Sequence, residues 1–523
     1  MTAIGLEARG IGSRVQVPTR PLIWLVFGSV VSLFASGWGW NIALAAWIAP
    51  VFLLRFSRTS RPAMAIAALA VVSFLQLACM GLESATSFFT DTVTTVLTSV
   101  LSVIFVIPYA LDRLFAGRLN ALGRVLLFPA AAAATEFIVG SLLPVGTSIG
   151  MRAFTQSENL ALVQLISLTG PYAIGFLIAC SAAVINHIWE NLTRETAVRW
   201  GGIFFAVLSA IVVFGEARLA IATWGSAGPT VKVAGITPNI APRTSAWKPV
   251  TMPNFPPSAE TQAAIRTPQM KTLYTAVQDE LLANTRAAAR AGAKIVLWSE
   301  TGAPVLEADK RALLERVATL AREENVYVDA AIGVPFERNE TYLIAPNGGQ
   351  QWHYRKNHPV PGLEPVAPFR NDVPVAETPF GKLSNVICYD GDFPALTRTP
   401  VDIMLLPGWD WREMGYTHTM NMARLRAIEN GYSLIRIDFI GVSAAFDPYG
   451  RVLAMQDTLP GQSHMMIADL PTKRVWTLYS EIGDVFAWLC IAAVIGFCTY
   501  GAVRPVRGPR ATHSFPMQSG QVP

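Results

Sequence analysis

The sequence contains few charged residues for its length. Of its 523 residues only 15% are Asp, Glu, Lys or Arg, whereas 52% are hydrophobic. This balance is too apolar for an ordinary water-soluble enzyme. The charge is also unevenly distributed, because long runs with little charge fill about the first 220 residues and recur once near Val485. Residues 230–480 have a mixed, globular composition, so the sequence predicts a membrane protein with one large water-exposed domain.

Cysteine is scarce as well, and its distribution is informative. Four of the five cysteines lie in apolar runs, namely Cys79, Cys180, Cys490 and Cys498. Cys388 is therefore the single thiol of the globular part and cannot form a disulfide within it. If that part lies outside the cytoplasm, where paired cysteines normally form disulfides, an unpaired thiol is a candidate for chemical use. The alternative is a small buried hydrophobic residue, the usual state of a free cysteine.

Other common signals of function are missing from the sequence. It shows no internal repeat and no Gly-rich phosphate loop. The net charge of +5 comes from arginines clustered between apolar runs, which excludes a basic surface for nucleic acid. His353 and His358 lie close together, but no cysteine or carboxylate cluster completes a metal site around them. We therefore expect no metal, no cofactor and no nucleic-acid partner.

Eight apolar runs are candidate membrane spans. They cover about Leu22–Ser36, Trp40–Leu54, Ala63–Leu82, Val93–Leu111, Val125–Leu143, Pro171–Ile188, Gly201–Ile221 and Val485–Tyr500. About 20 residues are needed to cross a bilayer core, so the first two are short and could form a tilted, tight or re-entrant pair. A cleaved signal peptide is the alternative for the first run, but apolar character resumes directly after Gly37–Gly39.

The basic residues of short loops predict the orientation. Alternate loops carry clusters of arginine: Arg9, Arg14 and Arg20; Arg55, Arg58 and Arg61; Arg113, Arg118 and Arg124; Arg194 and Arg199; Arg504, Arg507 and Arg510. The opposite ends carry almost none, with Arg152 and Arg218 as exceptions. We therefore expect both termini in the cytoplasm. The expected domains are 1–221 with seven spans, an extracytoplasmic domain at 222–484, an eighth span at 485–503 and a tail at 504–523.

Strand-like and helix-like segments alternate through the globular part. Expected strands are Val231–Thr237, Lys294–Trp298, Val326–Val334, Thr341–Ala345, Gln351–Tyr354, Leu383–Ile387, Val401–Leu406, Ser433–Asp438 and Val442–Phe446. Expected helices are Gln262–Ala291, Lys310–Glu324 and about Thr419–Asn430. A Pro-rich loop is expected after the first strand. This alternation favours a layered α/β fold.

Three chemically useful residues follow strands in the same manner. Glu300 ends the run KIVLWSE. Lys356 follows the expected strand Gln351–Tyr354, and Cys388 follows the expected strand Leu383–Ile387 within LSNVICYD. A thiol is mostly protonated at neutral pH and needs a base to become a good nucleophile. A carboxylate can take its proton, and an ammonium can stabilise the oxyanion formed when the thiolate attacks a carbonyl. Glu300 or Lys356 alone would more often be a solvated surface charge, but together with Cys388 they suffice for acyl transfer.

The motifs WSETGAP, YRKNHPVPGLEP and ICYDGDFP, in this order, resemble the Glu-Lys-Cys triad of the nitrilase (carbon-nitrogen hydrolase) superfamily. Such a domain inserted before the last of eight spans is similar to the membrane branch formed by apolipoprotein N-acyltransferases. The resemblance implies an α-β-β-α sandwich beside the helical membrane domain. It also implies a monomer in the bacterial inner membrane. There it would move an acyl chain from a phospholipid, through a Cys thioester, to the N-terminal amine of S-diacylglyceryl-cysteine lipoproteins.

Roles transfer by resemblance to individual residues. Glu300 would be the general base, Lys356 the oxyanion-stabilising residue and Cys388 the nucleophile. Glu364 matches a second functional glutamate, although it could simply pair with an arginine. Tyr389 matches the aromatic residue after the nucleophile.

Trp247 could match a functional tryptophan. Trp409, Trp411 and Tyr416 could form a lid at the membrane edge, since aromatic residues favour that interface, or could be packed core.

The sequence departs from the family pattern in three places. Asp390 stands where the family usually has Glu, LLPGWDWREMGY replaces an Asn-Asp-aromatic stretch, and GTSIGMRAFTQSENL lacks the Gly-Phe-Pro-Trp type motif. These departures concern recognition of donor and acceptor more than the chemistry. Two alternatives stay open: a membrane-tethered amidase or nitrilase in which water resolves the thioester, and a non-catalytic membrane scaffold.

Overall fold

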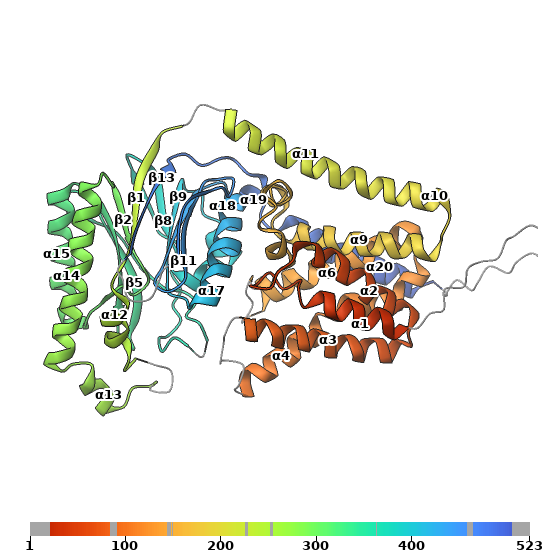
Figure 1. Cartoon of the computed structure of the whole chain (residues 1–523), viewed down its shortest axis with the longest axis horizontal. Helices are drawn as coiled ribbons and strands as arrows, with labels where there is room; N and C mark the ends of the chain where they lie inside the picture. Colours follow the sequence, from red (N-terminus) through yellow and green to blue (C-terminus); the bar gives the residue numbers. More distant parts are fainter. Residues whose placement is uncertain are drawn as a thin grey trace, which may run out of the picture.

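The computed structural model describes residues 21–83, 92–143, 148, 150–224, 228–250, 255–361, 363–457 and 464–504. These residues form a helical body and an α/β body that lie side by side (Figure 1). The long helix α11 (Gly202–Trp224) runs along one edge of the helical body, and the chain then enters the first strand of the α/β body. The last long helix, α20 (Val485–Ala502), returns the chain to the helical body.

The helical body is built from apolar helices. Besides α11 and α20 it contains α1 (Pro21–Ser32), α2 (Ala43–Thr59), α3 (Pro62–Glu83), α4 (Thr92–Ile104), α5 (Ile107–Phe115), α6 (Ala121–Phe137), α7 (Leu160–Val163), α8 (Ile166–Thr169), α9 (Tyr172–Glu190) and α10 (Arg194–Thr196). Within the described residues, six stretches are long and apolar enough to cross a membrane. They are Pro62–Gly81, Thr95–Arg118, Ala121–Leu142, Tyr172–Glu190, Arg194–Ala222 and Val485–Ala502.

The first two expected spans correspond to the shorter helices α1 and α2. The apolar helix α1 has only 12 residues, which is well below the length that a straight crossing requires. The helical membrane part is thus confirmed, whereas eight crossings and the domain boundaries stay predictions. Residues 1–20, which include the first arginine cluster, and residues 505–523 of the tail lie outside the described residues.

The α/β body contains two sheets packed face to face. The first has the order β13-β1-β2-β4-β5-β6, with β3 added beside β4. Its strands are β1 (Thr230–Thr237), β2 (Ile295–Trp298), β3 (Ala303–Pro304), β4 (Tyr327–Val334), β5 (Arg338–Ile344), β6 (Gln350–Arg355) and β13 (His464–Pro471). The second has the order β12-β11-β10-β9-β8-β7. Its strands are β7 (Val375–Thr378), β8 (Gly381–Asn385), β9 (Ile403–Gly408), β10 (Ser433–Asp438), β11 (Val442–Phe446) and β12 (Val452–Asp457).

Helices cover both outer faces of this pair of sheets. In Figure 1, α14 (Pro268–Arg290) and α15 (Glu307–Glu324) cover the face away from the helical body. On the other side, α17 (Arg412–Tyr416), a π-helical stretch η8 (Thr417–Ala423) and α18 (Arg424–Asn430) lie between the sheets and the helical body. The expected α-β-β-α sandwich is therefore confirmed.

The core between the sheets excludes water from the strand ends. Val233 and Leu297 of the first sheet and Leu405 and Ile435 of the second belong to one fully buried cluster. The sheets approach closely at Gly235, where an added Cβ would lie 1.8 Å from the Ile437 side chain. Such dense packing holds the strand ends in fixed positions.

Two sequence expectations need correction. The stretch Gln262–Ala291 is not one helix, because Thr267 caps a new helix and Pro268 occupies its first turn, which separates α13 (Ala259–Ala264) from α14. The expected Pro-rich loop after β1 is in part the helix α12 (Ile240–Trp247), which Asn239 caps through the backbone N–H of Ala241. Strands β12 and β13 were not anticipated, yet β13 pairs along the whole length of β1.

Buried hydrogen bonds connect the two bodies. Asn421 of η8 donates to the Gly37 carbonyl at 2.7 Å and accepts from the Ser157 hydroxyl, and all three residues are buried. Gly37 has φ +74° and an added Cβ would lie 2.9 Å from Phe154, so this turn requires glycine. The Ser148 backbone N–H donates to the Asp392 carbonyl at 3.1 Å. These bonds place the α/β body at one position over the helices.

Replacing Asn421 with Ala is expected to lower the free energy of unfolding by about 2 kcal/mol, because the buried Gly37 carbonyl and Ser157 hydroxyl lose their partner. Unfolding of the purified protein in detergent micelles, followed by tryptophan fluorescence, measures the change. Gln351→Ala, on an exposed position of β6, is the control and should change stability by less than about 0.5 kcal/mol. Equal losses in the two variants would contradict a role of Asn421 at the interface.

Candidate functional site

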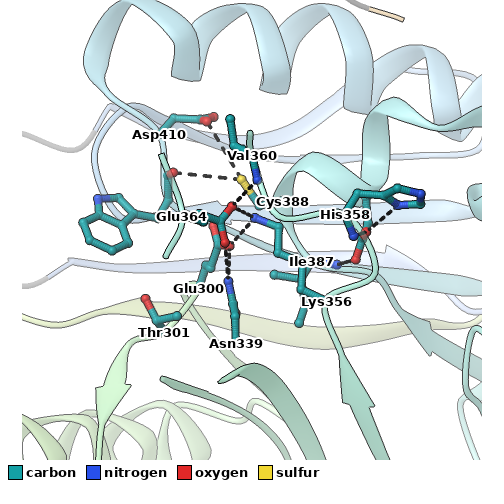
Figure 2. A network of polar contacts seen from close by, with 12 residues as sticks. Glu300, Thr301, Asn339, Lys356, His358, Val360, Glu364, Ile387, Cys388 and Asp410 are labelled. Atoms are coloured by element: carbon teal, nitrogen blue, oxygen red, sulfur yellow. Dashed lines mark hydrogen bonds and ion pairs between the residues drawn. The ribbon is translucent and has the colours of Figure 1, made fainter. Parts of the chain in front are cut away.

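The structure brings Glu300, Lys356 and Cys388 to one buried place (Figure 2). Glu300 follows β2, Lys356 follows β6, and Cys388 opens a short 3₁₀ turn after β8. The Glu300 backbone N–H donates to the carbonyl of Gly408, the last residue of β9, at 3.3 Å, so the two sheets are joined at this edge. Strand ends held by the sandwich core therefore position all three side chains.

A buried ammonium is the centre of the site. Lys356 is 3% exposed, and its Nζ lies 2.7 Å from Glu300 Oε1 and also forms an ion pair with Glu364. Asn339 of β5 donates to Glu300 Oε1 at 2.6 Å and to Glu364 Oε2 at 3.2 Å. Burial opposes the charged ammonium, but Glu300 and Glu364 outweigh it and raise the pKa of Lys356 well above its usual value. Lys356 is thus held as a cation.

Glu364 belongs to this cluster and, among the residues that the structure describes, forms its ion pair with Lys356 and with no arginine. Its Oε1 accepts the backbone N–H of Val360 at 3.1 Å, which fixes the loop after Lys356. Burial raises the pKa of Glu364, the Lys356 charge opposes this effect, and Glu300 adds to it. The position matched to a second functional glutamate is therefore within the same charged group as Lys356.

Cys388 lies in a strained backbone conformation at the turn. Its φ of +47° is in the left-handed region that residues with a Cβ rarely adopt, and such residues are typical of functional sites. The sulfur lies 3.9 Å from the Trp409 carbonyl oxygen and 4.0 Å from Asp410 Oδ1. Burial and the Glu300 charge raise the pKa of the Cys388 thiol well above its usual value, and Lys356 opposes them. The resting residue is a thiol that needs a base.

A second buried charge cluster lies on the other side of the sulfur. Arg436 Nη2 lies 3.9 Å from Cys388 Sγ and 2.6 Å from Asp410 Oδ2. His418 Nδ1 lies 3.0 Å from Asp410, and its Nε2 lies 3.3 Å from Asp392. Burial opposes ionisation of Asp410, but His418 and Arg436 lower its pKa below the usual range. Burial lowers the pKa of His418, but Asp410 and Asp392 outweigh it and raise that pKa.

Sequence reasoning missed this second cluster and Asn339. Asp410 follows the end of β9, the same strand-end signal that identified Glu300, Lys356 and Cys388. Arg436 lies within the fully buried strand β10, where a charged residue in an apolar run is itself a signal. Asn339 was missed because the strand was expected to begin at Thr341, whereas β5 begins at Arg338.

Asp390 has a structural position between two loops. It is fully buried and accepts from the Tyr354 hydroxyl at 2.9 Å and from the His358 backbone N–H at 2.8 Å and ring Nδ1 at 3.0 Å. It also accepts from the Asn357 and Ile387 backbone N–H groups at 3.3 Å each. A short carboxylate therefore joins the Lys356 loop to the Cys388 turn, and His358 supports that loop.

The aromatic residues singled out in the sequence differ in their partners and in their exposure. Tyr389 packs edge-on against Phe393, with ring centroids 5.3 Å apart. Trp247 ends α12 and lies 6.0 Å from Trp409 between ring centroids. Trp409 and Tyr416 are partly exposed, at 36% and 43%, so both retain surface that a ligand can contact.

The helical body and the α/β body match two different protein-family models. Residues 22–184 match the family model described as the apolipoprotein N-acyltransferase N-terminal domain, and residues 262–477 match that of carbon-nitrogen hydrolase. The chain is thus similar to apolipoprotein N-acyltransferases over its helical body and to carbon-nitrogen hydrolases over its α/β body.

Individual relatives agree with this assignment. The chain is 28% identical to the apolipoprotein N-acyltransferase of Bradyrhizobium diazoefficiens over 434 residues, which is 76% of each chain. It is 26% identical to that of Geobacter metallireducens over 65% of this chain and 67% of the relative. Among solved structures, an amidase from Nesterenkonia sp. aligns over 47% of this chain and 92% of its own, with 18% identity and a TM-score of 0.37.

Asp390→Ala is expected to lower the free energy of unfolding by about 3 kcal/mol, since it leaves buried backbone N–H groups and the Tyr354 hydroxyl without an acceptor. The same unfolding measurement in micelles applies. Asp469→Ala, which removes an exposed carboxylate paired with Lys232 at 3.5 Å, is the matched control with little expected effect. If both variants unfold alike, Asp390 does not join the two loops.

Glu300→Gln is expected to shift alkylation of Cys388 to lower pH. The Glu300 charge is one of the causes of the raised thiol pKa, so its removal lowers that pKa and yields more thiolate at a given pH. Lys356→Met should act in the opposite direction, because the ammonium favours the thiolate. The rate of iodoacetamide labelling, followed for the Cys388 peptide by mass spectrometry between pH 6 and 10, measures both shifts. A profile unchanged by either substitution would argue against this electrostatic coupling.

Proposed function

We propose that this protein transfers an acyl chain from a phospholipid, through a thioester on Cys388, to the N-terminal amine of S-diacylglyceryl-cysteine lipoproteins. The observation that carries the proposal is the buried group of Glu300, Lys356 and Cys388 at the strand ends. Similarity to apolipoprotein N-acyltransferases supports the choice of acceptor. The chain is a membrane enzyme, and the apolar helices of its first body suit two lipidic substrates.

The first half-reaction forms the thioester. Glu300 takes the proton of the Cys388 thiol, and the thiolate attacks the carbonyl carbon of a phospholipid ester. The Lys356 ammonium stabilises the resulting oxyanion. The tetrahedral intermediate then collapses, the carbon–oxygen bond of the ester breaks, and Glu300 returns the proton to the leaving alkoxide. The products are an acylated Cys388 and a lysophospholipid.

The second half-reaction transfers the acyl chain. The free amine of the acceptor attacks the thioester carbonyl, and Lys356 again stabilises the oxyanion. Glu300 takes a proton from the attacking nitrogen, the carbon–sulfur bond breaks, and the thiolate regains that proton. An amide forms and the thiol is restored. Because Glu364 and Asn339 contact the same Glu300–Lys356 pair, we assign them the role of keeping its geometry through both steps.

The arrangement in the membrane is part of the proposal. The helical body would lie in the inner membrane. The alternating arginine clusters support cytoplasmic termini and an α/β body on the extracytoplasmic side. Both substrates would then reach the site from the outer leaflet. A monomer is sufficient, because all of the proposed catalytic side chains come from one chain.

Incubation of the purified protein with phospholipid vesicles and a diacylated lipopeptide tests the function. The lipopeptide should gain the mass of one acyl chain, and a thioester adduct on the Cys388 peptide should accumulate without acceptor. Cys388→Ser and Glu300→Gln should each lower the transfer rate by at least about a hundredfold, the usual contribution of a nucleophile or base. Cys498→Ser, in the last helix, is the matched control with unchanged transfer.

The products separate the proposal from its alternatives. Release of free fatty acid or ammonia without a gain in lipopeptide mass would identify a hydrolase in which water resolves the thioester. Full transfer by Cys388→Ser would exclude the mechanism. No adduct and no product from the intact protein would leave a non-catalytic role.

A further inference from the structure

Arg243 is a buried cation without an acidic partner at ion-pairing distance among the described residues. It lies in α12, and its side chain is completely inaccessible to solvent. Burying an unpaired charge is costly, so the surroundings of the guanidinium must compensate for the water it has lost. Arg243 is not part of any motif that the sequence analysis identified.

Three aromatic rings supply part of that compensation. The guanidinium carbon lies 4.8 Å from the Trp247 ring centre, 4.3 Å from that of Trp409 and 4.8 Å from that of Phe439. Cation–π contacts of this kind are strongest where water is excluded. The rings also contact one another, with the Trp409 centroid 6.0 Å from Trp247 and 5.9 Å from Phe439. Arg243 therefore holds residues of three separate segments together.

The other side of Arg243 contacts the segment that carries the proposed base. Its Nη2 donates to the Glu300 carbonyl oxygen at 3.3 Å and to the Thr301 hydroxyl. Thr301 has φ +45°, a conformation that is unfavourable for a β-branched residue and must be held by its surroundings. The direction of the Glu300 side chain consequently depends on the Arg243 contacts.

Trp409 extends this connection to the nucleophile. Its carbonyl oxygen lies 3.9 Å from Cys388 Sγ, whereas its ring lies against Arg243. The ring is 36% exposed, so it combines a fixed buried side with surface open to an apolar ligand. Trp247 is 8% exposed, and the centre of its ring lies 6.0 Å from that of Trp409.

We propose that Arg243 is a positioning residue that joins the base Glu300 to an aromatic wall, formed by Trp247 and Trp409, which receives the acyl chain of the donor. The part of the inference that concerns the acyl chain rests on the proposed function. The connection between Arg243 and Glu300 does not depend on it.

Arg243→Met in the full-length protein tests the proposal. Thioester formation should slow by about tenfold or more, because the base loses its orientation. The preference for long over short acyl chains, measured with phospholipids of both kinds, should also fall. Arg243→Lys should restore only part of the rate and of the chain preference, because Lys keeps the charge but lacks the planar fork.

Arg311→Met is the control, because Arg311 is an exposed residue of α15 whose ion pair with Glu315 lies on the surface. It should leave the rate and the chain preference unchanged. If Arg243→Met lowers only the unfolding temperature and leaves the rate of thioester formation and the chain preference unchanged, its role is structural and the proposal is overturned.

A double-mutant cycle tests the connection without acyl transfer. Iodoacetamide labelling of Cys388 is compared for the intact protein, Glu300→Gln, Arg243→Met and the double variant. We expect Arg243→Met to change the labelling rate severalfold in the Glu300 background and much less in the Glu300→Gln background. Additive effects would overturn the connection. Absence of acyl transfer by the intact protein would reject the proposed function alone.

Discussion

The site depends on one buried ammonium shared between two carboxylates. Lys356 has almost no contact with water, and its charge offsets the negative charges of Glu300 and Glu364. Removing one member of such a group leaves an uncompensated charge and is strongly destabilising. The cluster is therefore a structural centre as well as a candidate catalytic one. Burial and the Glu300 carboxylate raise the pKa of the Cys388 thiol, and the ammonium opposes them.

Two kinds of support hold this cluster. Polar side chains fix it locally: Asn339 bridges the two carboxylates, and Asp390 joins the loop after β6 to the turn after β8. The sandwich core fixes it globally, because the strands that carry Glu300 and Cys388 are buried between helices and sheets. Asp390 also explains one departure from the family pattern. Its short side chain already meets donors on both sides, so a longer one would require the loops to separate.

Much of this could be predicted from the sequence. The α/β layers follow from alternating strand and helix patterns, and Glu300, Lys356 and Cys388 follow from their common position after strands. Asp410 also follows a strand, but the sequence interpretation of this stretch considered only the tryptophans on either side of it. Arg243 and Asn339 could not be identified, because their importance lies in contacts between segments distant in sequence. The break before α14 was missed because Thr267 and Pro268 form a helix start inside a run of good helix formers.

The turn that contains Cys388 ends at Asp392, which bonds to Ser148 of the helical body through both its backbone and its side chain. The sulfur and its support on the helices thus lie within one turn of five residues. The reactive atom consequently has a set height above the helices and cannot move toward a lipid without breaking that contact. With the proposed phospholipid donor, the substrate must therefore rise to the sulfur, and the depth at which its ester carbonyl lies in the bilayer becomes a criterion for selection in itself.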